Sequence, residues 1–173
     1  MRLNLGAGDR YASGWTNVDH AGCPHPADER VDLTGPLPWP AASAELVFCG
    51  HLLEHLHWAQ CRHLLKALRT IVVPGGQIMV VGPDIAGAQN ILDAGGVLEV
   101  PMGALKAGSC RWPGDEHRWD ATPAAVGRLL QLTGWTEIRH VPWDEIDAVW
   151  PVAERGPRWQ YAVTATAPEE EGP

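Results

Sequence analysis

The chain has 173 residues, of which 45% are hydrophobic and 20% charged, and 21 acidic against 13 basic side chains give a formal net charge of −8. At roughly 150 residues per domain, this length predicts one globular domain with a substantial core. A mean hydropathy of −0.15, with no apolar run near the roughly 20 residues that span a bilayer, excludes a membrane-spanning chain. The acidic excess disfavours a nucleic-acid groove, because affinity for phosphate backbones comes mainly from Lys and Arg.

The glycine-rich start has no secretory segment, so we expect a cytoplasmic protein. The chain has no CxxC pair and is too large to need disulfide stapling, so its cysteines are predicted to be free thiols. They are Cys23, Cys49, Cys61 and Cys110.

Short apolar segments that end at glycine, proline or an acidic residue predict strands. In chain order they are residues 1–6, 16–20, 29–33, 44–50, 77–84, 135–141 and 158–167. A sharp turn is expected at Pro74-Gly75-Gly76. Strands that alternate with helices indicate an α/β fold with a parallel sheet covered on both faces.

Leucines at helical spacing predict a helix from the end of the strand at 44–50 to Val73. A short helix is expected within 86–96, and another over 124–132 with Thr122 as its N-cap. Two further segments mix proline, glycine and tryptophan and are expected to be loops, namely residues 34–43 and 97–119.

The first predicted strand ends in the motif LNLGAG, in which glycine lets the backbone approach a ligand closely. Asp19 closes the second strand, where a carboxylate can accept both ribose hydroxyls of a nucleoside. The third glycine of a GxGxxG motif is missing, and Asp9 stands where it would disfavour a pyrophosphate. These features favour a cationic nucleoside without phosphates over an ordinary strand-ending turn.

From Leu3 to about Ala165 the chain resembles the class I S-adenosylmethionine (SAM)-dependent methyltransferases, most of all the small ones with an LEHL segment and a PGG turn. The resemblance rests on motifs in one order: LNLGAG, GWTNVDH, VDL, LPWPAASAELVFCGHLLEHL, VVPGGQIMVVGPD and HRWDATPAAVGRLLQLTGW. It implies a doubly wound, Rossmann-like, mostly parallel seven-stranded sheet with helices on both faces and an antiparallel last strand. One SAM-binding domain would occupy residues 1–167, followed by an acidic, disordered tail at 168–173.

The same resemblance implies roles for individual residues at the ends of the first strands. Gly6 and Gly8 would lie alongside the methionine part of SAM, and Asp19 would bind the ribose. The remaining cofactor-binding positions are Asp32 and Leu33, which would meet the adenine, and Cys49, Gly50 and His51, which would border the methionine end. A strand-end cap is the alternative for Asp32.

His51, Glu54 and His55 also form the pattern HxxEH, an inverted zinc-protease signature. It leaves open a zinc hydrolase with Glu54 as base and a downstream acid as third ligand. Because the segment follows a buried strand and the resemblance accounts for it without metal, we expect no metal site here. Glu54 and His55 are instead expected to tie the helix start to neighbouring loops.

Methyl transfer from a sulfonium releases a neutral group, so a base is needed only when the acceptor must lose a proton. His117, in the irregular stretch GDEHRW, is the first candidate base and His51 the second. A structural role in the loop is the alternative for His117 and its neighbour Arg118. Four late tryptophans lie in loops that would roof the acceptor pocket and are candidates for an aromatic wall: Trp112, Trp143, Trp150 and Trp159. Packing beneath loops, or a dimer surface, is the alternative, and packing is favoured for any single one of them.

The sequence thus predicts a SAM-dependent methyltransferase acting on an oxygen or nitrogen atom of a small-molecule acceptor, with no nucleic-acid or membrane partner. A SAM-binding or sensing protein without transfer activity is the alternative from another class. A homodimer that completes the acceptor pocket also stays open.

Overall fold

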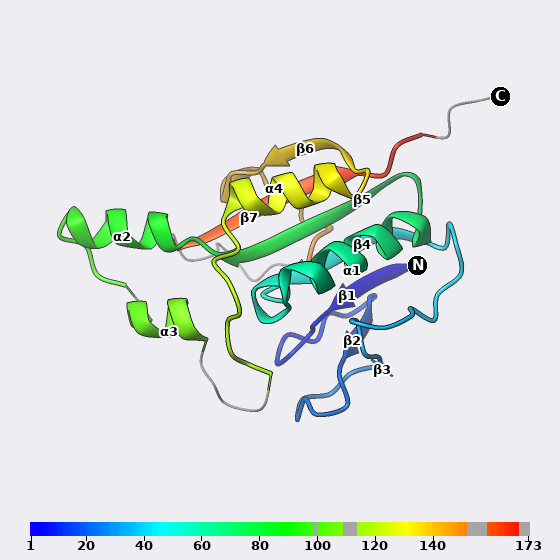
Figure 1. Ribbon diagram of the computed structural model, residues 1–173, viewed down its shortest axis with the longest axis horizontal. Coiled ribbons are helices and arrows are strands. Elements are labelled where there is room, and N and C mark those ends of the chain that lie inside the picture. Colours follow the sequence, from blue (N-terminus) through cyan, green and yellow to red (C-terminus); the bar gives the residue numbers. More distant parts are fainter. Residues whose placement is uncertain (99, 109–113, 152–158, 170–173) are drawn as a thin grey trace.

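The computed structural model describes residues 1–98, 100–108, 114–151 and 159–169. Seven strands form one sheet in the order β3-β2-β1-β4-β5-β7-β6 (Figure 1). They are β1 (Arg2–Leu5), β2 (Thr16–Asp19), β3 (Glu29–Arg30), β4 (Ala44–Gly50), β5 (Val72–Pro83), β6 (Thr136–His140) and β7 (Gln160–Thr166). Strands β1 to β5 are parallel to one another, and β7 runs antiparallel to both β5 and β6. The expected mostly parallel seven-stranded sheet with an antiparallel last strand is confirmed.

The helices flank this sheet or follow its strands. They are α1 (Trp58–Ile71), α2 (Ile85–Asp93), α3 (Met102–Ala107), α4 (Pro123–Leu132) and the 3₁₀ helices η1 (Leu53–His55) and η2 (Trp143–Glu145). Thr122 caps α4 as predicted, since its hydroxyl accepts a hydrogen bond of 3.3 Å from the Ala125 N–H.

Three local predictions were wrong. The helix expected up to Val73 is divided into η1 and α1, because Leu56 is extended and His57 starts α1 with a capping box to Gln60. The strand expected over 29–33 has only two residues. The expected loop at 97–119 contains α3, whose Ala, Leu and Lys residues favour helix and whose Leu105 is buried.

The PGG turn lies inside β5 as an irregularity. Ala44 pairs with Val72, but Leu46 pairs with Gln77, so the residues between the two pairs bulge out of the ladder. Gly75 has a φ of +73° there, and its N–H donates to the carbonyl oxygen of Ala167 at 3.0 Å.

Alternate residues of the central strands point to opposite faces of the sheet and build two apolar cores. On one face, α1 and α4 pack over the main core, which includes Val47, Cys49, Ile78 and Val80. On the other face lies a second core built around Trp15, Phe48, Met79, Val81, Trp150 and Ala162.

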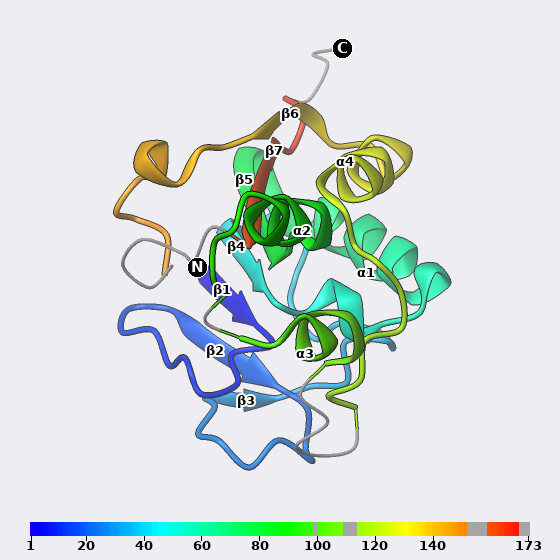
Figure 2. The same cartoon turned by 90° about the vertical axis from the view of Figure 1, so that its left-hand side faces the viewer.

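Figures 1 and 2 show α1 and α4 side by side on the first face and α2 and α3 beyond the tips of the strands. Among the described residues, the helix on the second face is η2. That face is otherwise covered by the connection between β1 and β2 and by residues 141–150.

Three of the cysteines, Cys23, Cys49 and Cys61, are buried free thiols as predicted, and Cys110 lies outside the described residues. The described chain contains no helix with the length and apolar character needed to cross a membrane. Residues 170–173 of the predicted tail also lie outside the described residues.

Candidate functional site

The candidate site lies at the carboxyl edge of the sheet, defined as the edge where the parallel strands β1, β2 and β4 end. The loop after β1 turns at Gly6 and Gly8, whose φ angles are +68° and +53°. The N–H groups of Gly6 and Ala7 donate to the Val18 carbonyl oxygen at 2.9 and 3.1 Å. A Cβ atom at Gly6 would lie 3.1 Å from Cδ1 of Leu52, the residue before η1. The glycine turn is thereby packed between β2 and the segment after β4.

Asp19 ends β2 and holds this turn through its carboxylate. Its Oδ2 accepts a hydrogen bond of 2.7 Å from the Gly8 N–H, and its Oδ1 accepts one of 2.8 Å from the His20 N–H. The Asp19 side chain is 9% exposed. Because each carboxylate oxygen has two lone pairs, both oxygens retain capacity for hydroxyl donors. The sequence-predicted turn and acid are therefore neighbours in space.

Asp32 stabilises the turn that follows β3 through its side chain. One of its carboxylate oxygens accepts hydrogen bonds from the Thr34 hydroxyl at 2.7 Å and the Thr34 N–H at 2.9 Å. These bonds, the hydroxyl first, lower the pKa of Asp32. The contacts match the strand-end cap considered as its alternative role. Leu33 is buried in the main core.

The end of β4 is shaped by close packing. Cys49 is fully buried, and burial raises the pKa of its thiol well above the ordinary range. A Cβ atom at Gly50 would lie 2.5 Å from the Phe48 ring, so the chain needs glycine there. His51 then takes a φ of +51°, which turns the backbone away from the strand.

Both ring nitrogens of His51 are engaged. Its Nδ1 lies 3.0 Å from Oε1 of Glu54, and its Nε2 lies 2.7 Å from the Gln160 side-chain nitrogen. An amide nitrogen donates, so His51 accepts at Nε2 and donates from Nδ1 to the carboxylate. The sequence did not single out Gln160, although a glutamine at the start of an apolar strand is a signal that could have found it.

His117 comes to the same region from the segment after α3. Its Nδ1 lies 2.9 Å from the Leu105 carbonyl oxygen, and its ring packs edge-on against His55 with 4.9 Å between centroids. Burial lowers the pKa of His117, so the neutral ring is favoured. The Arg118 N–H donates to the Glu54 carbonyl oxygen at 2.7 Å, so this segment is fixed to η1.

The HxxEH segment is not arranged as in the zinc-protease hypothesis. Among the described residues, the side chains close enough to share a metal ion are those of Glu54, His55 and His117, a group without His51. Glu54 does bind its neighbour His51, and Nδ1 of His55 lies 3.3 Å from the Glu116 carbonyl oxygen. The expected ties between η1 and a neighbouring loop are therefore present.

No family model and no curated protein matches the sequence. Solved structures do match. A SAM-dependent methyltransferase from Archaeoglobus fulgidus superposes with a TM-score of 0.62 at 16% identity, over 95% of this chain and 85% of that one. One from Methanosarcina mazei gives 0.57 at 12% identity, over 98% and 92%. Human N-acetylserotonin methyltransferase in complex with SAM gives 0.51 at 19% identity, over 82% of this chain and 34% of that one.

The protein has the fold of the SAM-dependent methyltransferases. In this methyltransferase fold, the late tryptophans do not all face the carboxyl edge. Trp143 and Trp150 belong to the second core, where the Trp143 indole N–H donates to the Gln160 carbonyl oxygen at 3.0 Å. Trp159 lies beside His51, with 6.0 Å between ring centroids. Trp112 lies outside the described residues.

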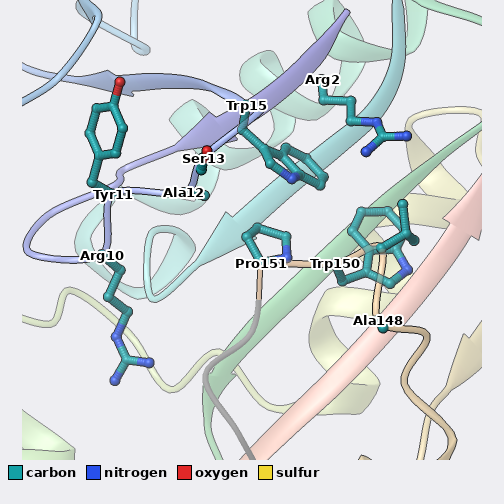
Figure 3. Close-up of a pocket in the computed structure, with 10 residues that line it drawn as sticks. Arg2, Arg10, Tyr11, Ala12, Ser13, Trp15, Ala148, Trp150 and Pro151 are labelled. Carbon is teal, nitrogen blue, oxygen red and sulfur yellow. The ribbon is translucent and has the colours of Figure 1, made fainter.

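The protein also has a cleft of about 470 Å³ on its second face (Figure 3). It lies between the β1–β2 connection and residues 148–151, with Trp15 and Trp150 beside it. Arg2, at the start of β1, lines it as well. The cleft therefore extends toward the amino end of β1, whereas Gly8 and Asp19 lie beyond the other end.

Proposed function

We propose that this protein is a methyltransferase that moves the methyl group of SAM to an oxygen or nitrogen atom of a small-molecule acceptor. The observation that carries the proposal is the 2.7 Å hydrogen bond from the Gly8 N–H to the Asp19 carboxylate. It puts an acid at the end of β2 next to a turn that has glycine at two positions of positive φ. Both features occur in a fold shared with SAM-dependent methyltransferases.

Under this proposal, the cofactor lies along the carboxyl edge. Gly6 and Gly8 lie alongside its methionine part, and the Asp19 carboxylate accepts hydrogen bonds from the ribose hydroxyls. The adenine meets the backbone at Asp32 and Leu33, because the side chains of both are already engaged. The turn formed by Cys49, Gly50 and His51 borders the methionine part through its backbone and the His51 ring.

The reaction breaks the bond between the sulfonium sulfur and the methyl carbon, and the electron pair stays on the neutral thioether. A new bond forms between that carbon and the acceptor atom, which gives up its proton. We assign that proton to Nε2 of His117, because its Nδ1 already donates to a carbonyl oxygen and leaves Nε2 with a lone pair. His51 is the second candidate base, since it must first break its hydrogen bond to Glu54 or to Gln160.

Titration calorimetry with SAM and with its demethylated product tests the cofactor site. Asp19→Ala is expected to weaken SAM binding by about 1.5–3 kcal/mol, because a charged hydrogen-bond acceptor is lost. Asp19→Asn keeps one acceptor oxygen and separates loss of the charge from loosening of the turn. Asp144→Ala, at an exposed position of η2 on the second face, is the matched control. A wild-type protein that binds neither ligand would refute the proposal.

A SAM-sensing protein without transfer activity is separated from an enzyme by turnover. Incubation with methyl-labelled SAM and a panel of hydroxyl and amine acceptors should give a labelled product. His117→Ala is then expected to lose turnover while keeping its affinity for SAM. Tight SAM binding without label transfer to any acceptor would favour the sensor.

A further inference from the structure

Three potential metal-binding side chains meet beside η1 although they come from segments far apart in the sequence. Glu54 and His55 belong to η1, directly after β4, and His117 belongs to the segment between α3 and α4. One nitrogen or oxygen atom from each lies within 4.8 Å of the other two. The Arg118 N–H holds the two segments together by its bond to the Glu54 carbonyl oxygen.

The Glu54 carboxylate is buried, with 1% of its surface exposed. Its Oε1 is bound by His51, whereas its Oε2 is buried without a hydrogen-bond partner among the described residues. A buried carboxylate oxygen without a partner is costly, and a cation or a hydrogen-bond donor would satisfy it.

The two histidines present the complementary arrangement. Nδ1 of His55 and Nδ1 of His117 each face a backbone carbonyl oxygen, of Glu116 and Leu105 respectively. A carbonyl oxygen only accepts, so both Nδ1 atoms carry the proton and each neutral ring keeps a lone pair on Nε2. Neither Nε2 has a hydrogen bond to the described part of the chain. Histidines that bind metals are commonly held in this way by a carbonyl oxygen on the opposite nitrogen.

We propose that Glu54, His55 and His117 bind a zinc ion through Oε2 of the carboxylate and Nε2 of each imidazole. Two histidines and one glutamate are a ligand set of catalytic zinc sites, which keep a further position open. Both histidines are partly exposed, so the group is accessible from solvent. Zinc bonds of about 2.0–2.1 Å place tetrahedral ligand atoms roughly 3.4 Å apart. The three ligand atoms here lie within 4.8 Å of one another, so side-chain movements of about 1 Å would bring them to that separation.

This site differs from the HxxEH hypothesis in the role of two residues. Glu54 is a ligand and not the base, and His51 is a positioning residue that orients the carboxylate from Oε1. Zinc and a proton compete for Nε2 of His117, so ligation and general-base catalysis are alternative roles of that atom. If the protein transfers methyl groups as proposed above, zinc would bind the acceptor atom and lower its pKa. Zinc binding itself does not depend on that activity.

The test uses the full chain, stripped with a chelator and titrated with Zn²⁺ against a chromophoric competitor. We expect one tight equivalent in the wild type. Removal of a residue that supports a metal ligand typically lowers metal affinity by roughly 10–100-fold, and we expect a loss of zinc affinity of about that size in His51→Gln. His117→Gln and His55→Gln should each lower zinc affinity by more than this, because they remove a ligand. His63→Gln, at an exposed position of α1, is the matched control and should bind as the wild type does.

Replacement of the buried Glu54 can prevent folding, so the half-buried histidine variants carry the test, with circular dichroism as the folding check. Zn²⁺ should raise the melting temperature of the wild type and not that of His117→Gln. Co²⁺ should give the visible absorption of a tetrahedral site without a thiolate charge-transfer band. A wild type that binds no zinc, equal affinity in His117→Gln, or a thiolate band would each overturn the proposal. Calorimetry with SAM is a separate measurement, so failure of one proposal does not decide the other.

Discussion

The backbone N–H of Gly8 and the carboxylate of Asp19 are joined by a hydrogen bond of 2.7 Å that fixes the turn after β1 to the end of β2. The turn depends on glycine at two positions with different surroundings. A Cβ atom at Gly6 would meet the Leu52 side chain at 3.1 Å, whereas at Gly8 the nearest atom is the Gly6 carbonyl oxygen at 4.0 Å. Both positions have positive φ.

We therefore expect Gly8→Ala to lower the free energy of unfolding by about 1–2 kcal/mol from backbone strain alone. Gly6→Ala should lower it further, because the Leu52 side chain must also move. Urea denaturation measures both. Gly103→Ala, in the first turn of α3 with open space around it, is the control and should be neutral or stabilising. Equal losses at Gly6 and Gly8 would contradict this account of the turn.

The β1–β2 connection depends on one buried side-chain amide, that of Asn17, which is 0% exposed. Its oxygen accepts hydrogen bonds from the Asn4 side chain at 2.9 Å and the Ala12 N–H at 2.8 Å. Its nitrogen donates to the carbonyl oxygens of Ala12 and Trp15 and to the Asp28 carboxylate. One side chain thus organises a connection that contains no helix.

Asn17→Leu has a similar volume but leaves several of these buried groups without partners, each costing about 1–3 kcal/mol. We expect a total loss of roughly 2–4 kcal/mol and, at about 2–4 °C per kcal/mol, a clear fall in melting temperature. Thermal unfolding followed by circular dichroism measures it. Asn90→Leu, at an exposed position of α2, should change little. A variant at Asn17 as stable as the wild type would show that the network is not needed.

The sheet could be predicted from the sequence because its signals are local. Apolar runs such as AELVFCG and QIMVVGP read as buried strands, and Thr122 marks the start of α4. The glycine turn and Asp19 were predictable for the same reason, since each ends a strand. The antiparallel direction of β7 was expected from the resemblance and is observed.

The contacts around η1 could not be predicted, because they join residues distant in sequence. His117 meets His55, and Gln160 meets His51 across 109 positions. The HxxEH spacing is typical of a continuous helix, but here the helical segment η1 ends at His55. His51 lies before η1 and binds Glu54 and Gln160. Trp150 appeared suited to a ligand wall, yet an indole serves equally well in a core, and the structure places it against Trp15.

Asp28 should make the protein sensitive to acid. The Tyr11 hydroxyl donates to its Oδ1 at 2.7 Å and the Asn17 N–H to its Oδ2 at 2.7 Å. These bonds, Tyr11 first, hold the pKa of Asp28 below its ordinary value of 3.8. Since the folded-state pKa is below the unfolded one, the ionised carboxylate stabilises the fold at higher pH. That contribution is lost as the pH falls through the folded-state pKa.

Asp28→Asn should accordingly be less stable than the wild type at neutral pH, and the gap should narrow as the pH drops below the ordinary value of 3.8. Urea denaturation over a pH series measures both proteins. Asp144→Asn, exposed on η2, controls for the general effect of removing one acidic charge. A gap that stays constant across the series would mean that Asp28 acts through geometry and not through its charge.

The buried thiols should be inert in the folded protein. Burial raises the pKa of Cys61 to about 12 and those of Cys49 and Cys23 above their ordinary value, so little reactive thiolate exists at neutral pH. In a Cys110→Ser background, iodoacetamide should label none of the three until denaturant is added. Cys23 should react first, because it lies in a loop whose local opening costs less than unfolding of the main core that holds Cys49 and Cys61. Peptide mass spectrometry resolves the order, and labelling of Cys49 ahead of Cys23 would show that the sheet opens before the loop.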